Sequence, residues 1–225
     1  MNVENMKRQA GEKAVEYIHD GMTLGLGSGT TVNWMVKKLG DCVREGLNVR
    51  AVSSSVKTEK LAHELGIPLV DSDDVNELDL AIDGADEADE HFNLIKGGGG
   101  SLLREKMVLE LSEKKIIIID EQKRVSSLGK FHVPVEITPF SWKQTWKKVT
   151  DTGCLPTLRK VDDQPFVTDN GNYILDCDYH GAEVNQSLHE TLKMTTGVLE
   201  TGIFTGLADV ILTGHHHGVS IHAKN

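Results

Sequence analysis

The chain has 225 residues, of which 39% are hydrophobic and 26% are charged, and its formal net charge is -10. This length and composition predict a folded protein of one or two domains with a substantial core, and they exclude a largely disordered chain. The acidic charge argues against nucleic acid as the main partner, because phosphate backbones are bound by clustered Lys and Arg.

Cysteine usage and the absence of long apolar runs indicate the compartment. Cys42, Cys154 and Cys177 occur without a CxxC pair, which favours reduced thiols over a disulfide framework or a zinc site. Residues 1–10 lack an apolar signal core, and the longest strongly apolar run, 116–119, is far too short to span a bilayer. We therefore expect a cytoplasmic protein that has no membrane partner.

The first elements are predicted to be a helix, a strand, a glycine-rich turn and a second helix. Apolar residues recur at three- and four-residue steps over 3–17, which predicts an amphipathic helix that ends before Gly21. A short buried strand over 22–26 runs into the sequence GLGSGTT at 25–31, and a second helical pattern covers 32–43. A glycine turn between a strand and a helix is a candidate anion site, because backbone N–H groups at the helix N-terminus face the ligand.

The turn at 25–31 matches neither of two common phosphate-binding motifs. A dinucleotide fingerprint needs its third glycine three positions after the second, and here Gly29 follows Gly27 by two. A strand predicted over 48–52 ends in serines at 53–55, where a ribose-binding Asp or Glu would be expected, so NAD is excluded. A P-loop would need a Lys after the last glycine. The hydroxyl groups then either line a pocket mouth or only cap helices, and those concerned belong to Ser28, Thr30, Thr31, Ser53, Ser54 and Ser55.

Two carboxylates follow a further predicted strand. After a helix over 57–65 and a short strand over 67–70, the strand at 78–82 ends in Asp83-Gly84-Ala85-Asp86-Glu87. Carboxylates at the carboxyl end of a strand point into the crevice where open α/β sheets bind ligands. Asp83 and Asp86 are therefore candidate site residues.

The same acidic stretch raises the alternatives of a metal site and of a solvated turn. Asp83, Asp86, Asp89 and Glu90 form a cluster, but their spacing lacks the alternating ligands and the terminal Glu of a calcium loop. We therefore expect no metal here.

The glycine run that follows is the sequence feature that most strongly indicates a ligand. Lys96 precedes four consecutive glycines, Gly97, Gly98, Gly99 and Gly100, which form a loop whose backbone can approach a ligand closely. Ser101 is a suitable N-cap, so a helix over 102–111 would carry Glu105 in its first turn. A cation and a carboxylate would then face one pocket, whereas the alternative is a flexible loop with surface charges.

A central parallel strand is predicted from the all-apolar run within 114–120. Its exit loop carries Lys123, which would lie at the same sheet edge as the other loops and could neutralise an anion held by the first glycine turn. The alternative is an ordinary surface lysine.

From Val133 the pattern changes to short strands and helices. We expect a strand at 134–139, helices at 141–149 and 183–194, a hairpin that joins 164–168 to 173–177 through Asp169-Asn170-Gly171-Asn172, and strands at 197–204 and 208–212. The fold class is therefore α/β, a Rossmann-like, mostly parallel sheet with helices on both faces, plus a smaller α+β domain. The α/β domain would comprise 1–132 and 200–225, and the smaller domain 133–199.

The histidines at His215, His216, His217 and His222 invite a metal assignment. Adjacent side chains project in different directions, no carboxylate partner is close in sequence, and disorder is usual at chain ends, so we expect a solvated tail instead of a metal site, whether or not the tail is ordered.

Together these motifs identify a family. The glycine turn at 25–31, the serines at 53–55, the stretch 83–87, the segment 96–106 and Leu128-Gly129-Lys130-Phe131 all resemble ribose-5-phosphate isomerase, type A. The resemblance runs essentially end to end. It implies interconversion of ribose 5-phosphate and ribulose 5-phosphate without metal or nicotinamide, in a homodimer or homotetramer.

The resemblance also implies roles for individual residues. Glu105 corresponds to the proton-transferring base, and its polar partners around the substrate hydroxyls and carbonyl are Asp83, Asp86 and Lys96. On the substrate-binding side the resemblance implies Lys7, Ser28, Gly29, Thr30, Thr31, Gly97, Gly98, Gly99 and Lys123. Ser101 stands where the family more often has Ala or Cys, which concerns loop detail.

Two other classes of function remain open at this point. One is a non-catalytic sensor of sugar phosphates on the same architecture, against which the chain has no separate DNA-binding segment. The other is a CoA transferase with a nucleophilic Glu, against which the short length counts. Base and oxyanion donors suit an aldose–ketose isomerase, since a proton must move between adjacent carbons.

Overall fold

The computed structural model describes residues 2–224, which form two compact units. The first unit comprises Met1–Ala85, Arg104–Arg124 and Gly206–Asn225, and the second comprises Asp86–Leu103 and Val125–Thr205. The domain boundaries at 132 and 199 stay a prediction.

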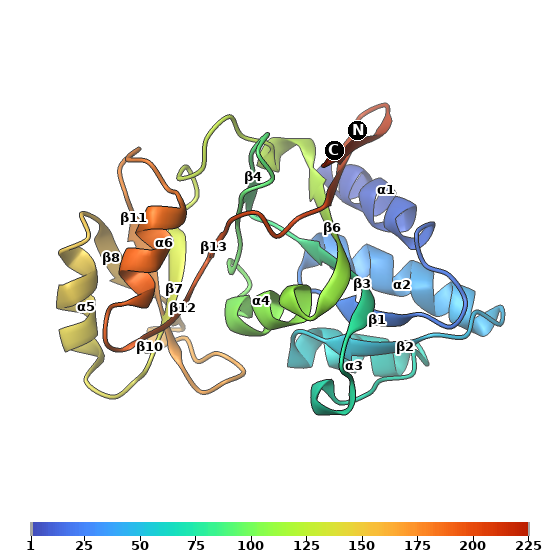
Figure 1. Ribbon diagram of the computed structural model, residues 1–225, viewed down its shortest axis with the longest axis horizontal. Helices are drawn as coiled ribbons and strands as arrows, with labels where there is room; N and C mark the ends of the chain where they lie inside the picture. The colour runs from blue at the N-terminus through green and yellow to red at the C-terminus, as the bar shows by residue number, and fades with distance from the viewer. Residues whose placement is uncertain (1, 225) are drawn as a thin grey trace. The chain divides into compact units, whose positions relative to one another are not determined.

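The first unit is built on a six-stranded sheet (Figure 1). The strand order is β15-β14-β6-β3-β1-β2, and all neighbours are parallel except the β14–β15 pair. The strands are β1 (Thr23–Leu26), β2 (Arg50–Ser53), β3 (Leu78–Gly84), β6 (Ser112–Asp120), β14 (Val210–His215) and β15 (Gly218–Ala223). The helices are α1 (Val3–Val15), α2 (Thr30–Arg44), α3 (Val56–Glu64) and α4 (Leu102–Glu110), with short 3-10 turns η1 (Ser72–Asp74) and η2 (Glu121–Lys123).

Helices cover both faces of this sheet. Leu24, Ile82 and Ile118 pack in one core with the buried apolar faces of α1 and α2. The opposite face meets α4, because a Cβ atom on Gly25 would lie 2.5 Å from a methyl group of Val108. Strand β6 is buried from both sides, which explains its run of consecutive isoleucines. The predicted α/β class with helices on both faces is confirmed.

The second unit contains a four-stranded antiparallel sheet of order β12-β7-β11-β8. Helices α5 and α6 pack on its apolar face through Val149 and Leu192. These elements are β7 (Val133–Ile137), α5 (Trp142–Thr150), β8 (Leu155–Leu158), β11 (Tyr173–Asp178), α6 (Gln186–Lys193) and β12 (Val198–Thr201). Two small sheets complete the unit, β13-β5-β4 and β10-β9, with β4 (Glu87–Ala88), β5 (Leu94–Ile95), β9 (Lys160–Val161), β10 (Gln164–Pro165) and β13 (Ile203–Phe204).

The predicted hairpin between 164–168 and 173–177 is wrong. Strand β10 pairs with β9, and β11 pairs with β7 and β8. The Asn-rich turn lies instead against a buried carboxylate, because Glu136 Oε1 accepts hydrogen bonds from Thr168 Oγ1, Asn170 Nδ2 and Asn172 Nδ2 at 2.9, 3.1 and 2.9 Å.

Two other strand predictions are also corrected. Residues 67–70 form only an isolated parallel bridge, between Leu69 and Ala51. The single strand predicted at 197–204 is divided at Gly202 into β12 and β13, which belong to different sheets. Gly202 packs so closely against the Lys96 carbonyl oxygen that no Cβ atom would fit there, and this close approach ends the first strand.

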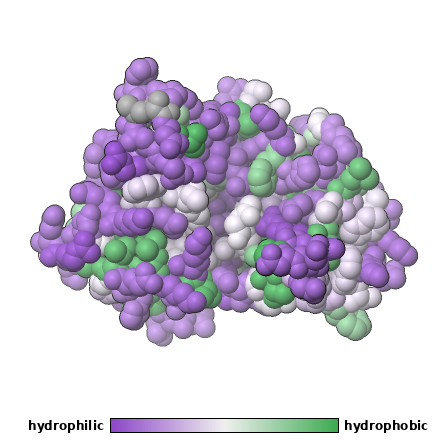
Figure 2. All heavy atoms as spheres, turned by 180° about the vertical axis from the view of Figure 1, so that it is seen from behind, coloured by the Kyte–Doolittle hydropathy of each residue, from purple (hydrophilic) through white to green (hydrophobic). Residues whose placement is uncertain are grey.

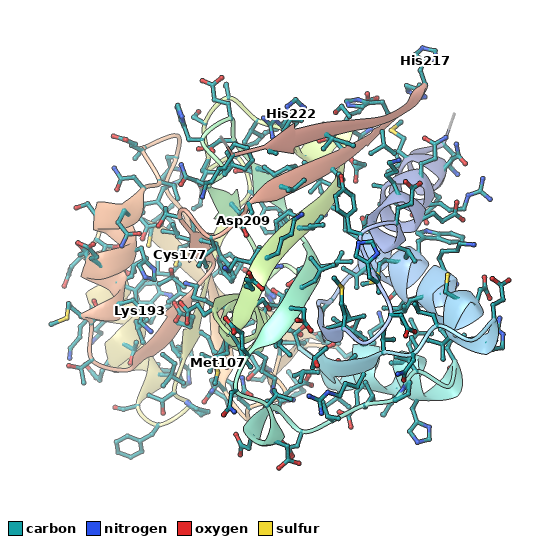
Figure 3. All side chains as sticks on the ribbon, turned by 45° about the vertical axis from the view of Figure 1, so that its right-hand side comes forward. Met107, Cys177, Lys193, Asp209, His217 and His222 are labelled. Atoms are coloured by element: carbon teal, nitrogen blue, oxygen red, sulfur yellow. The ribbon has the colours of Figure 1, made fainter. Side chains whose placement is uncertain are left out.

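The histidine-rich segment is ordered and belongs to a β-hairpin, which settles a point that the sequence left open. Strand β14 ends at His215 and β15 returns antiparallel from Gly218, and Figure 3 shows His217 at the tip of this hairpin and His222 on β15. The His215 ring bonds on both sides, with Nδ1 2.9 Å from Glu121 Oε2 and Nε2 2.8 Å from Ser220 Oγ. Backbone pairing and these side-chain bonds fix the segment.

All three cysteines are free, as predicted, with Cys154 and Cys177 in the core of the second unit.

Figure 2 shows one face of the molecule, which is mostly hydrophilic with separate small hydrophobic patches. Among residues 2–224, no helix combines the length and the apolar character that crossing a membrane requires.

Candidate active site

The carboxyl edge of the six-stranded sheet brings the first glycine turn and Asp83 into direct contact. Ser28 N–H and Gly84 N–H donate to Asp83 Oδ1 at 3.0 and 2.7 Å. Asp83 is only 2% exposed, so these bonds hold a buried carboxylate in one orientation. The structure thus joins two of the predicted site elements that lie far apart in the sequence.

A cluster of buried hydroxyl groups from residues 54–58 packs against the first glycine turn, 25–31. Ser28 Oγ lies 2.7 Å from Ser55 Oγ and 3.0 Å from Ser54 Oγ, and Thr58 Oγ1 donates to the Gly27 carbonyl at 2.9 Å. Ser54, Ser55 and Thr58 are buried, so these side chains support the turn instead of lining a pocket mouth. Ser55 also caps α3 by accepting a hydrogen bond from Thr58 N–H. Helix capping was one of the two roles that the sequence left open for these hydroxyl groups.

The turn ends at the N-terminus of α2. Gly29 has a φ of +120°, which a residue with a side chain rarely adopts, and no side chain caps the helix. The first N–H groups of a helix have no intrahelical partners, and with the helix dipole they favour an anion. Gly29 and Thr30 are exposed, whereas Thr31 is buried. This geometry suits a phosphate group at the turn.

Lys123 lies at the same edge of the sheet. It is in η2, directly after β6, and its Nζ donates to the Ala85 carbonyl at 2.6 Å. Strand β3 separates β1 from β6, so the two carboxyl ends are about 10 Å apart at the usual strand spacing. A lysine side chain reaches across most of that distance.

Glu105 is a buried carboxylate in the first turn of α4. It is 4% exposed, and its Oε2 atom is shielded from solvent. The helix begins at Leu102, directly after the glycine run, as the sequence predicted. Carboxylates are seldom buried without a role in structure or function, so Glu105 is the first candidate for proton transfer.

Lys7 extends from α1 toward Glu4. Its Nζ is 2.9 Å from Glu4 Oε1, and this hydrogen bond, together with one from Trp34, lowers the pKa of Glu4. The ion pair lies three residues along one helix. The contacts of Lys7 by themselves give no further sign of the substrate-binding role that the resemblance implied.

In the second unit, the glycine run and Asp86 are in direct contact. Gly98 N–H donates to Asp86 Oδ2 at 2.7 Å, and Gly100 N–H donates to the Gly97 carbonyl at 3.0 Å, which closes a tight turn. Gly97 and Gly100 have φ values of +101° and +90°, so this turn requires glycine at both positions. The predicted loop is therefore a fixed turn in this structure.

Lys96 is almost fully buried beside an aromatic ring. It is 2% exposed, and its Nζ lies 5.6 Å from the centroid of the Phe204 ring, a distance at which the cation is attracted to the ring face. Its backbone N–H donates to Gly202 at 2.9 Å, which pairs the start of the glycine run with β13. The first contact holds the Lys96 side chain, and the second holds its backbone.

The acidic stretch does not form a metal centre among the described residues. Asp89 Oδ1 accepts from the N–H groups of His91 and Asn93 at 2.8 Å each, which is a structural turn. Within residues 2–224, no three His, Cys, Asp or Glu side chains converge as metal ligands. That the reaction needs no metal stays a prediction.

A family model described as ribose 5-phosphate isomerase A (phosphoriboisomerase A) matches residues 50–218. The chain belongs to the ribose 5-phosphate isomerase A family. A ribose-5-phosphate isomerase A of Bacillus mycoides is 50% identical over 216 residues, covering 96% of this chain and 98% of the relative. One from Oceanobacillus iheyensis is 44% identical and covers 97% and 98%.

Solved structures of the family agree in fold. The ribose 5-phosphate isomerase A of Methanocaldococcus jannaschii matches with a TM-score of 0.94 and 35% identity, over 99% of this chain and all of that one. A D-ribose-5-phosphate isomerase in complex with phospho-erythronic acid matches with a TM-score of 0.95 and 35% identity, over the full length of both chains. The chain is therefore an isomerase by family, and the recognition made from its motifs is confirmed.

One motif shared with the isomerase family is held by a residue whose role the sequence did not reveal. Glu87 is 3% exposed, and its carboxylate accepts hydrogen bonds from Gly129 N–H and Phe131 N–H at 2.8 and 2.6 Å. Glu87 thus anchors the segment 128–131 instead of contributing to a solvated turn. The sequence offered one signal, since the stretch 83–87 and the segment 128–131 both match the family. Their spacing alone could not show that Glu87 is the carboxylate that binds residues 129 and 131.

Proposed function

We propose that this chain interconverts D-ribose 5-phosphate and D-ribulose 5-phosphate through an enediolate, with Glu105 as the general base. The observation that carries the proposal is the buried carboxylate of Glu105 in the first turn of α4, directly after the glycine run, in a member of the isomerase family.

The proton balance is simple. Glu105 removes the proton from C2 of the open-chain aldose, and the electron pair moves to give an enediolate across C1 and C2. The same carboxylate returns the proton to C1, while one proton moves from O2 to O1. From the open-chain sugar onward no σ bond between heavy atoms is broken, so this step needs only one base and polar groups that stabilise the oxyanion.

Asp83, Asp86 and Lys96 are the groups proposed for the oxygen atoms. The two carboxylates would exchange protons with O1 and O2 or help open the furanose ring, and the ammonium group would stabilise the enediolate. Hydrogen bonds from Ser28, Gly84 and Gly98 hold the carboxylates in place. Such preorganised groups act without reorganisation during the reaction.

The phosphate is proposed to bind at the first glycine turn and Lys123. A chain with a net charge of -10 must gather positive potential locally to hold a dianion. The open N-terminus of α2, the hydroxyl groups of Thr30 and Ser28 and the Lys123 ammonium group would supply it, with Lys7 as a further substrate contact.

A ligand of one relative suits this mechanism. Phospho-erythronic acid, present in one of the matching structures, carries a carboxylate next to a hydroxylated carbon. A carboxylate is planar and anionic, as an enediolate is. We expect the same acid to bind this chain more tightly than ribose 5-phosphate, because it resembles the intermediate more than the substrate.

Further parts of the proposal concern the cellular setting. The reaction would need no metal and no nicotinamide cofactor and would serve the non-oxidative branch of the pentose phosphate pathway in the cytoplasm. The protein would act as a homodimer or homotetramer, with an α/β domain of 1–132 and 200–225 and a small domain of 133–199.

The deciding experiment is an assay of ketose formation from ribose 5-phosphate. Rapid formation of ribulose 5-phosphate, with inhibition by phospho-erythronic acid, supports the proposal. Binding of ribose 5-phosphate without ketose formation would instead favour a sugar-phosphate sensor.

A further inference from the structure

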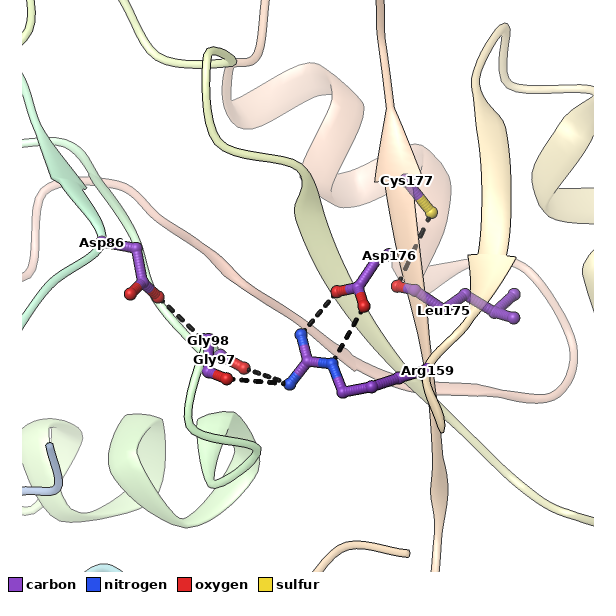
Figure 4. Close-up of polar contacts among 7 residues, drawn as sticks. All are labelled: Asp86, Gly97, Gly98, Arg159, Leu175, Asp176 and Cys177. Carbon is purple, nitrogen blue, oxygen red and sulfur yellow. Dashed lines mark hydrogen bonds and ion pairs between the residues drawn. The ribbon is translucent and has the colours of Figure 1, made fainter. Parts of the chain in front are cut away.

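One arginine holds the glycine run from the side opposite to Asp86. Arg159 Nη1 donates to the Gly97 carbonyl at 2.8 Å, and the N–H group of the same peptide bond, on Gly98, donates to Asp86 Oδ2 at 2.7 Å (Figure 4). Because a peptide unit is planar, bonds at its two ends fix its orientation. The Gly97–Gly98 peptide plane therefore cannot rotate without breaking one of them.

The next peptide unit is held by the same guanidinium group. Arg159 Nη1 lies 3.2 Å from the Gly98 carbonyl oxygen. In a trans peptide the N–H group points away from the carbonyl, so the Gly99 N–H is directed away from Arg159. Within the part of the chain that the structure describes, this N–H donates to no protein group, and space beside Gly99 is open. It is available to a ligand oxygen.

Arg159 is itself firmly placed. Its Nε and Nη2 atoms donate to the two carboxylate oxygens of Asp176 on β11 at 2.9 and 2.5 Å, and its backbone N–H donates to the Ile174 carbonyl at 2.8 Å. The side chain is 14% exposed. A bidentate pair of this kind fixes the plane of the guanidinium group and leaves Nη1 directed at the glycine run.

Phe166 completes the support. Its ring lies 5.8 Å from the Arg159 guanidinium carbon, and its N–H donates to the Arg159 carbonyl at 2.9 Å. The ring also occupies the space that a side chain on Gly100 would need. The loop between β8 and β11 thus contacts the glycine run through both a cation and an aromatic ring.

We infer that Arg159, held by Asp176, is a positioning residue for the isomerase reaction: it sets the peptide planes of Gly97 and Gly98 so that the Gly99 N–H and the Asp86 carboxylate are directed at substrate oxygens. This inference rests on the proposed function. Neither residue touches the reacting atoms, so loss of the arginine lowers the rate of the chemical step more than it weakens binding of the phosphate group.

The test compares Arg159→Met with Lys193→Met. Methionine roughly keeps the length of the side chain and removes every hydrogen-bond donor. Lys193 is the control, because its ion pair with Glu200, at 2.9 Å, lies at the opposite edge of the same sheet. For Arg159→Met we expect kcat to fall about 10- to 100-fold, because small displacements of catalytic groups cost about that much. KM and inhibition by inorganic phosphate should change less than about threefold. Lys193→Met should retain its kcat.

Two further variants separate positioning from stability. Asp176→Asn should reduce kcat in the same direction, and the double variant should be little worse than Arg159→Met, because both substitutions break one linkage. Arg159→Lys keeps the charge but cannot pair in bidentate fashion while reaching the loop, so we expect it to recover part of the lost kcat.

The inference is overturned if folded Arg159→Met keeps kcat within about twofold of the wild type, or if Lys193→Met loses as much. If Arg159→Met does not fold, Arg159→Lys decides: a lowered kcat at an unchanged melting temperature supports the inference, and an unchanged kcat refutes it. Wild-type enzyme without isomerase activity would refute the proposed function, and this inference with it. An active wild type with unaffected Arg159 variants would refute the inference alone.

Discussion

The position that a Cβ atom would take on Gly27 is already filled by the carboxyl group of Asp83. Any side chain at residue 27 must therefore move this carboxylate, whose Oδ1 atom accepts hydrogen bonds from Ser28 and Gly84. The glycine is needed here for close approach, since the turn brings a backbone atom against a catalytic candidate.

We predict that Gly27→Ala lowers kcat/KM by about 10²-fold, because it displaces Asp83, and destabilises the fold by about 1–3 kcal/mol through overpacking. Steady-state kinetics and urea unfolding measure the two effects. Gly84→Ala is the matched control, since its new methyl group would meet only ordinary contacts, the nearest at 3.7 Å from the Ser28 carbonyl oxygen. Equal losses in both variants would argue against a specific clash with Asp83.

Lys123→Ala should raise KM for ribose 5-phosphate by about 10- to 150-fold, since a charge-assisted hydrogen bond contributes about 1.5–3 kcal/mol. Free ribose, which lacks the phosphate, is the comparison substrate. Lys60→Ala removes an equal charge from the exposed side of α3 and should leave KM unchanged. A Lys123→Ala variant that handles both sugars equally badly would show that this lysine does not bind phosphate.

Glu105→Gln should preserve binding and lower kcat by about 10²–10⁴-fold, because the amide keeps the shape but cannot accept the C2 proton. Glu110→Gln, at the exposed end of the same helix, is the control. In deuterated water, the wild type should incorporate solvent deuterium in a fraction of turnovers. A near-normal kcat for Glu105→Gln would move the search for the base to Asp83 or Asp86.

Exhaustive removal of metal ions with a chelator should leave the activity intact, because the proposed chemistry needs only protein groups. In the acidic stretch, Asp89 already accepts hydrogen bonds from the backbone N–H groups of His91 and Asn93. The measurement is kcat before and after dialysis against a chelator. Activity that disappears and returns only with one divalent ion would require a metal in the mechanism.

The Glu121–His215 pair should make the stability of the first unit depend on pH in the acidic range. The hydrogen bond to His215 lowers the pKa of Glu121 below its ordinary value of 4.5. A carboxyl group with a lowered pKa in the folded state stabilises the fold above its unfolded pKa, and this stabilisation is lost as the pH falls through the folded value. The free energy of unfolding, measured with urea, should therefore be higher for the wild type than for Glu121→Gln at pH 6, and the difference should shrink as the pH falls below 4.5. A constant difference across this range would contradict the assignment.

Periodicity was sufficient to predict strands β1, β2, β3, β6 and β14 of the first sheet, whereas β15 was not predicted, because its residues follow the histidine run and were expected to form a solvated tail. The isoleucine run of β6 can only be a strand covered on both faces, and Asp83 is the last residue but one of β3, close to the strand end that the sequence indicated. Local pattern carries this information because each element buries one or two whole faces.

The wrong strand pairing had a cause that sequence pattern could not reveal. Asn170 and Asn172 form a good hairpin turn signal, but their side chains bind the buried Glu136, which is distant in sequence. A tertiary hydrogen bond thus overrode turn propensity. The contact of Arg159 with the glycine run escaped prediction for the same reason, because an isolated arginine gives no signal of its partner.

The strand order of the first sheet bears on how the protein is made. Strand β14, comprising Val210–His215, lies inside the sheet between β15 and β6, although β1, β2, β3 and β6 are all translated before it. During synthesis on a ribosome, one edge of β6 stays unpaired until the residues after 210 have emerged. An exposed apolar strand edge invites pairing with other chains, so the nascent protein should depend on chaperones until those last strands arrive.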